Sequence, residues 1–241
     1  MVLKYSSLAV CMIFLLSIGC KSANNESKAA EAEVTSLPLL GVSCTSSSSY
    51  RLESGSQISW RMGKLIQGSP DLILVDGSMG VDGVWSFDSA SLVGSRAEFL
   101  FDVSSVKSDT PLRDERIKTF VLLAPKSLPV RLSVDAFDAK AEEFKDGDSL
   151  NIQAFGKLSI AGQDSSRMKL PLHVEKKDGK ILVSTLEAIK VNLRSDERIN
   201  GINLSERLAE LLTQVPGVSL YDSTEISLKL SFKPYDCSSG R

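Results

Sequence analysis

The side chains that could do chemistry are few: one histidine, four cysteines and a short run of charges. Catalysis needs reactive groups that converge, and a metal site needs ligands at suitable spacing. His173 lies between Leu172 and Val174, at a position that faces water in a predicted strand. The sequence contains no phosphate-binding loop, zinc-ligand spacing or nucleophile motif. We therefore expect a protein that is not an enzyme and uses no metal or cofactor.

The N-terminal residues have the features of a targeting segment. Lys4 precedes an apolar run from Leu8 to Ile18, which is too short to cross a bilayer comfortably. The run leads to Gly19-Cys20, and a small residue before a cysteine resembles a bacterial lipobox. We expect residues 1–19 to be a signal peptide and Cys20 to be lipidated, since two or three acyl chains would anchor the protein firmly. The alternative is ordinary signal cleavage that leaves Cys20 free.

The remaining cysteines, Cys44 and Cys237, stand just before and just after the predicted folded body. In an oxidising compartment this pair predicts a disulfide between the two ends of the chain. Closing so long a loop would stabilise the fold by at most ~5 kcal/mol. The alternative is two free thiols. Residues 20–45 then form the lipidated cysteine and a flexible tether, and residues 46–236 form one domain.

Composition excludes some partners, and the N-terminal segment predicts where the protein is located. The chain of 241 residues carries a net charge of −2, so no basic excess exists to neutralise nucleic-acid phosphates. With 42% hydrophobic residues, the domain can bury a core without metals. We expect an exported protein, lipid-anchored to a bacterial cell envelope at the outer membrane or the periplasmic face. The sequence leaves open whether it forms a homodimer.

Alternating apolar and polar residues dominate the chain from Tyr50 onward. Segments near positions 50–62, 96–104, 130–136, 150–160, 167–175 and 225–233 all alternate, which predicts antiparallel strands with one buried face. Dipeptides such as Asp178-Gly179 predict turns between them. Near 181–193 the apolar parity changes from Leu182 to Ile189, which predicts a β-bulge.

Two short helices interrupt the predicted sheet. Thr110-Pro111 predicts a cap and a helix start, and Asn203 with Glu206 predicts a capping box before a second helix. At least eight strands with one consistently apolar face favour a mainly β fold, an antiparallel up-and-down lipocalin-like β-barrel with two short helices. A β-sandwich is the competing architecture, because periodicity does not separate the two.

Three stretches within residues 48–233 resemble the YceI-like family of lipocalin-like barrels, known as polyisoprenoid-binding proteins. Ser56–Trp60 stands where the family has an alternating strand. Residues 103–118 resemble the family's strand, threonine turn and Arg-Asp-Glu helix. Gly156-Lys-Leu-Ser-Ile-Ala-Gly162 resembles its Gly-x-Leu-Thr-Ile-x-Gly hairpin. The resemblance implies a barrel that holds an apolar polyisoprenoid, such as a quinone. The expected partners are then this ligand and the membrane, with the homodimer left open.

The apolar strand face supplies the candidate ligand site. An eight-stranded barrel is wide enough either to be filled by side chains or to hold one thin ligand, so both readings stay open. Arg113 and Asp114 form either a solvated charged face or a latch over the barrel mouth. The functional alternatives are a lipoprotein that binds, stores or shuttles a polyisoprenoid, and a ligand-free structural or protein-interaction module. The candidate lining residues are Ile58, Trp60, Phe99, Phe101, Val103, Phe120, Leu132, Val134, Leu158, Ile160, Leu170 and Leu172.

Overall fold

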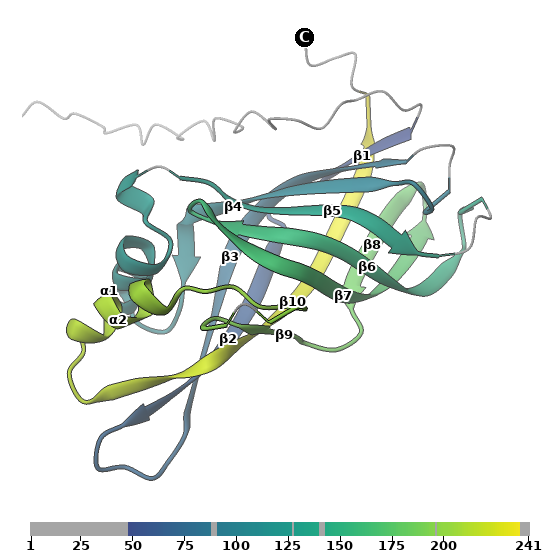
Figure 1. Ribbon diagram of the computed structural model, residues 1–241. Coiled ribbons are helices and arrows are strands. Elements are labelled where there is room, and N and C mark those ends of the chain that lie inside the picture. Colours follow the sequence, from purple (N-terminus) through teal and green to yellow (C-terminus); the bar gives the residue numbers. More distant parts are fainter. Residues whose placement is uncertain (1–47, 88–90, 127, 140–142, 196, 237–241) are drawn as a thin grey trace, which may run out of the picture. The chain divides into compact units, whose positions relative to one another are not determined.

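The computed structural model describes residues 48–87, 91–126, 128–139, 143–195 and 197–236, and its strands form one ten-stranded sheet (Figure 1). Every strand pairing between its elements is antiparallel, as the alternating pattern predicts. The strands are β1 (Ser48–Leu52), β2 (Gln57–Ile66), β3 (Ile73–Phe87), β4 (Arg96–Lys107), β5 (Val130–Asp138), β6 (Ser149–Ile160), β7 (Gln163–Lys177), β8 (Lys180–Thr185), β9 (Ile189–Asn192) and β10 (Val218–Tyr235).

The strand pairings close into a ring. Neighbours run from β2 through β8 in chain order, and β10 pairs with both β8 and β2. The short strand β1 pairs with both β10 and β3, and the short strand β9 pairs with β10. The predicted mainly antiparallel fold is therefore confirmed, with a barrel-like ring and an up-and-down strand order. Because the sheet closes on itself, its ring strands leave no long unpaired edge.

Burial follows the predicted alternation in most strands. Phe99 and Phe101 of β4, and Leu170 and Leu172 of β7, are buried on the inner face. In β5 the buried parity shifts from Val134 to Phe137, across a register irregularity between Val134 and Ala136. One extra residue at such an irregularity turns the following side chains to the other face.

The prediction for residues 181–193 was wrong in detail. Ile181 and Val183 are buried with Ile189 and Val191, so the inward parity does not change. The chain instead leaves the sheet after β8 and rejoins it as β9, and both segments pair with β10. The wrong prediction came from Leu182, which is apolar but only half-buried on the outer face.

The helices gather at one end of the sheet (Figure 1). They are α1 (Pro111–Arg116), a π-helical turn η1 (Ile117–Val121), a 3₁₀ turn η2 (Ala124–Lys126) and α2 (Ser205–Thr213). Thr110 is the residue before α1, but its side chain makes no capping hydrogen bond. The capping box before α2 is also absent, because Leu204 occupies the cap position and the Asn203 Oδ1 accepts from the backbone N–H of Ser205. No described helix is long and apolar enough to cross a membrane.

The opposite end of the sheet is filled by aromatic rings. Trp85 is only 2% exposed and stacks on Phe87 and Phe137, with ring centroids 5.2 and 5.1 Å apart. The ring of Phe232 contacts Trp85 edge-on, and the indole N–H of Trp85 donates a 3.0 Å hydrogen bond to Ser95 Oγ. Aromatic pairs of this kind add ~0.5–1.5 kcal/mol each beyond burial. We call this cluster the aromatic end.

Candidate functional site

The sheet encloses apolar cavities whose sizes increase toward the helices. Beside the aromatic end is a space of about 20 Å³, lined by Trp85, Phe99 and Val134 among others. Next comes the inner cavity, of about 90 Å³. Its walls are entirely apolar and are formed by Ile58, Met79, Phe101, Leu122, Val130, Leu132, Leu158, Ile160, Met168, Leu170, Ile189, Ile226 and Leu228.

The outer cavity lies at the helical end and is the largest of these three, at about 190 Å³. An engineered apolar cavity of roughly 150 Å³ stays dry and binds benzene, so this volume suffices for a small apolar group. Its lining combines three strands with both helices. The lining residues are Trp60, Met62, Lys64, Val75, Thr110, Leu112, Arg113, Arg116, Ile117, Leu211, Val215, Val218 and Leu220.

Trp60 sets the strand wall of the outer cavity. It pairs with Gly77 on β3, and a Cβ atom at Gly77 would collide with the Trp60 indole. The absence of a side chain at position 77 therefore lets the ring lie flat across the neighbouring strand. Ile58, two residues earlier on the same face of β2, already lines the inner cavity. The two cavities thus adjoin consecutive residues of one face of β2, Trp60 and Ile58, which is a separation of one side-chain repeat.

The turn η1 separates the two cavities on the helical side. Ile117 lines the outer cavity and Leu122, directly after η1, lines the inner one. The N–H of Leu122 donates to the Ile117 carbonyl, an i to i+5 contact that widens the helix at this point. Such π-turns are rare and occur mostly as single turns, often at functional sites. Movement of this turn would therefore change how the two spaces communicate.

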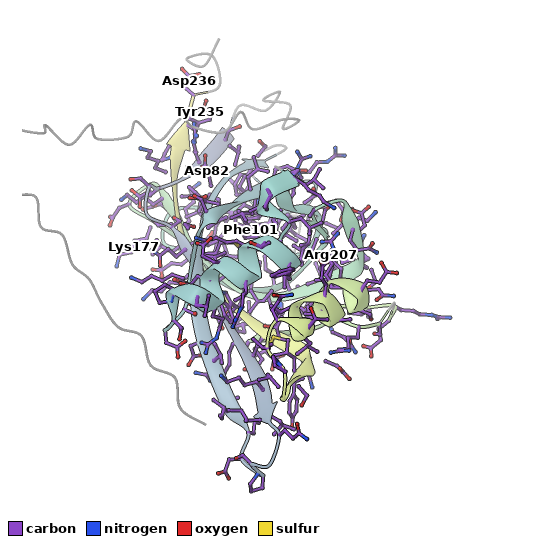
Figure 2. All side chains as sticks on the ribbon, turned by 90° about the vertical axis from the view of Figure 1, so that its left-hand side faces the viewer. Asp82, Phe101, Lys177, Arg207, Tyr235 and Asp236 are labelled. Atoms are coloured by element: carbon purple, nitrogen blue, oxygen red, sulfur yellow. The ribbon has the colours of Figure 1, made fainter. Side chains whose placement is uncertain are left out.

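Arg207 of α2 fixes the helices to the sheet (Figure 2). Its guanidinium donates to the carbonyls of Val121, Ile160 and Ala161 at 3.2, 2.9 and 3.1 Å. No carboxylate pairs with it in the described part of the chain, and desolvation lowers the pKa of this guanidinium below its ordinary value. One side chain thus ties α2 to the residue that ends η1 and to the turn between β6 and β7.

The two predicted latch residues are separate in the structure. Arg113 lines the outer cavity and forms an ion pair with Asp109, on the turn before α1. Asp114 is buried, and its carboxylate accepts hydrogen bonds from the N–H and hydroxyl of Ser108, at 2.8 and 2.6 Å. Both side chains therefore hold the entry to α1. Their role as a latch over a ligand stays a prediction.

The predicted lining residues occupy different levels of the interior. Ile58, Phe101, Leu132, Leu158, Ile160 and Leu170 line the inner cavity. Phe99, Val134 and Leu172 line the small space beside Trp85, and Trp60 lines the outer cavity. Val103 packs half-buried against the core, and Phe120, half-buried on η1, lines none of these three cavities. Ligand contact by any of them stays a prediction.

Sequence reasoning missed most of the outer cavity. Two of the missed residues, Val75 and Leu220, lie in strand segments that do not alternate cleanly. A third, Leu211, lies on α2, and the sequence does not reveal where that helix packs. Met62 stands at the end of the first alternating segment, but it was not predicted to be a lining residue. The role of Arg207 was not predicted. The one indication in the sequence is its position among the leucines of α2, where a cation faces the core side.

The remaining chemical candidates are not brought together. The nitrogens of His173 lie 2.8 Å from Asn151 Oδ1 and 3.3 Å from Ser149 Oγ, on the polar face of β7. The described residues contain no group of three or more histidine, cysteine or acidic side chains that could hold a metal. Cys20, Cys44 and Cys237 lie outside the described residues, so the lipidation and disulfide predictions are not tested.

Comparison with known proteins identifies the fold. No protein-family model matches the sequence, and no curated protein is similar enough to be matched. Among solved structures, a polyisoprenoid-binding domain from Saccharophagus degradans, implicated in plant cell wall breakdown, aligns with a TM-score of 0.60 at 12% identity. The alignment covers 77% of this chain and 98% of that domain.

Two further structures are similar. BcnA from Burkholderia cenocepacia has a TM-score of 0.50 at 15% identity, over 75% of this chain and 98% of BcnA. A YceI protein from Campylobacter jejuni has a TM-score of 0.38 at 20% identity, over 64% of this chain and 83% of its own length. The first two alignments show that the chain has the fold of those proteins, and the predicted YceI-like fold is confirmed.

Proposed function

We propose that this protein binds a thin apolar ligand of the polyisoprenoid class inside its barrel-like sheet. The observation that carries the proposal is the outer cavity, which is mostly apolar, lies at the helical end and stands one side-chain repeat from the wholly apolar inner cavity. Burying apolar surface gains roughly 25 cal/mol per Å², so a linear hydrocarbon needs no specific polar contact along its length. The fold neighbour from Saccharophagus degradans, itself named a polyisoprenoid-binding domain, supports this ligand class.

The aromatic end limits how deep a ligand would reach. The space beside Trp85 is about 20 Å³, too small for a hydrocarbon group, and the tightly stacked rings leave little room to move. A ligand therefore enters from the helical end and stops at the inner cavity. Its depth depends on how far η1 and Leu122 move aside.

The two tryptophans of the chain provide an internal test, because one lies at each end. We expect a soluble quinone with a decyl tail to quench the fluorescence of the Trp85→Phe variant saturably, since that variant keeps Trp60. The Trp60→Phe variant, which keeps only the indole at the aromatic end, should show no saturable quenching. Equal quenching of the two variants would contradict entry from the helical end.

A cavity-filling variant tests the same site without fluorescence. Leu220→Trp on β10 would occupy the outer cavity, whereas Ser219→Trp places the same side chain one residue away, on the opposite face of the strand. We expect the first variant to weaken quinone binding at least tenfold and the second to leave it unchanged. Mass spectrometry of gently extracted protein should detect a stoichiometric isoprenoid. Its absence under mild extraction would favour the ligand-free interaction module.

The membrane anchor is a separate part of the proposal. We infer that Cys20 is lipidated and holds the exported protein at the bacterial cell envelope, because Gly19-Cys20 follows an apolar leader. Replacing this cysteine in Cys20→Ser should move the protein from the membrane fraction to the soluble fraction. Retention of the variant in the membrane fraction would exclude the anchor while leaving the ligand site intact.

A further inference from the structure

Two cations without counter-charges line the outer cavity. Lys64 extends from β2 and Arg116 from α1, and both are half-buried. Neither side chain forms a hydrogen bond or an ion pair with any residue in the described ranges. A third cation of the lining, Arg113, is by contrast paired with Asp109. The cavity therefore contains two positive charges that the described protein leaves uncompensated.

The rest of the lining provides no negative charge to balance these two cations. Not one of its residues is aspartate or glutamate, and nearly all the others are apolar. The two carboxylates of α1 already have partners, since Glu115 pairs with Lys118 and Asp114 accepts from Ser108. A charge removed from water is costly unless it is paired, and Lys and Arg are rarely buried without a partner.

We propose that the outer cavity binds the anionic head group, a carboxylate or phosphate, of a single-chain amphiphile, with Lys64 and Arg116 supplying the positive charges. This inference rests on the proposed function, because it assigns a head group to a ligand whose apolar tail that function already requires. Charge-assisted hydrogen bonds to an anion are about twice as strong as neutral ones. The Thr110 hydroxyl makes no cap bond and is a further donor in the same lining.

The placement of the two cations suits one head group and one tail. Lys64 belongs to the strand wall, where it pairs with Leu220, and Arg116 belongs to the helical wall, directly before Ile117. A head group between them would bridge the two walls. From there Trp60 and Ile58, on the same face of β2 as Lys64, lead to the inner cavity, whose lining is wholly apolar. The tail would follow this path.

Calorimetric titration of the purified full chain tests the head group. The ligands are dodecyl phosphate, dodecanoate and dodecanol, which share one tail, together with inorganic phosphate, which has none. We expect both anionic amphiphiles to bind at least tenfold tighter than dodecanol at low salt, and inorganic phosphate to bind far more weakly than dodecyl phosphate. Lys64→Gln and Arg116→Gln should each weaken the anionic amphiphiles about tenfold and change dodecanol binding less than twofold. The control Lys229→Gln, exposed on β10, should change neither.

The outcomes separate this inference from the proposed function. Equal affinity for dodecanol and the anions, or anion binding unaffected by both glutamine variants, would overturn the anionic head while the apolar ligand site stands. Inorganic phosphate binding as tightly as dodecyl phosphate would also overturn it, because the site would then recognise a free anion. Failure of all three amphiphiles to bind would overturn both. Circular dichroism of each variant confirms that it is folded.

Discussion

Apolar side chains are used differently at the two ends of the barrel-like sheet. At the aromatic end Trp85 stacks between Phe87 and Phe137, and the remaining space is about 20 Å³. At the helical end, side chains of similar polarity surround cavities of about 90 and 190 Å³. Rings that interlock fill space, whereas aliphatic residues under a helical cover leave it partly open. Tight packing and open volume are thus located in different regions of one core.

The connection between the ends is the long strand β10. Its 18 residues extend roughly 60 Å at about 3.3 Å per residue. Val218 and Leu220 line the outer cavity near one terminus, and Phe232 packs on Trp85 near the other. The strand also pairs with β2 and β8 and so closes the ring. A substitution at either end of this strand should therefore report on its own region, which makes the comparison testable.

The largest expected effect is the loss of a tryptophan from the aromatic end. Trp85→Ala removes a 2% exposed ring and its hydrogen bond to Ser95, so we expect a loss of about 3–5 kcal/mol in the free energy of unfolding. Trp60→Ala, at a half-buried ring, should cost about half as much or less. Urea unfolding measures both. Similar losses would mean that the helical end is packed as tightly as the aromatic end.

A smaller effect is expected from Gly77→Ala, which places a methyl group against the Trp60 ring. Overpacking of this kind costs about 1–3 kcal/mol, and here it would push the ring toward the outer cavity. Part of the loss should be recovered in the double variant with Trp60→Ala. The recovery is only partial because the Lys107 carbonyl oxygen also lies 2.7 Å from the added Cβ. Strict additivity of the two substitutions would show that the ring does not lie over position 77.

Arg207→Met should loosen the helical end alone. The substitution keeps an apolar stem but leaves the carbonyls of Val121, Ile160 and Ala161 without their donor. We expect about 1–3 kcal/mol less protection for the amides of α2 in hydrogen exchange. The amides around Trp85 should change little. Arg198→Met, at an exposed arginine, is the matched control, and an equal loss of protection at both ends would contradict separate regions.

The smallest effect concerns acid stability near β1. Hydrogen bonds from Lys180 and Ser231 hold the pKa of Glu53 below its ordinary value of 4.5. A lowered pKa means that this carboxylate stabilises the fold above pH 4.5 and that its contribution is lost as the pH falls through the lowered value. Glu53→Gln should therefore reduce the slope of stability against pH below 4.5 and leave the helical end unaffected. Thermal unfolding between pH 3 and pH 7 measures this slope, and an unchanged slope would exclude the link.

Much of the fold was predictable because alternation is a local property. The inward faces of β4 and β7 were predicted correctly, since burying one face of a strand requires apolar residues at every second position. The residues concerned are Phe99, Phe101, Leu170 and Leu172. The prediction failed at Leu182, where an apolar residue lies on the outer face. Thr110 does occupy the cap position of α1, but its side chain makes no capping bond, and Asp114 accepts from Ser108 there instead. The predicted cap at Asn203 was wrong, because Leu204 occupies the cap position of α2.

What the sequence alone determined is the position of most strands, most of their inward faces and the apolar character of the interior, because these depend on neighbours one or two residues apart. The tertiary structure decided which part of that interior is filled. Arg207 contacts residues 46, 47 and 86 positions away, and the outer cavity joins side chains of β2, β3, α1, α2 and β10. No local pattern encodes such distances, since they arise only when the ring closes and the helices pack onto its end.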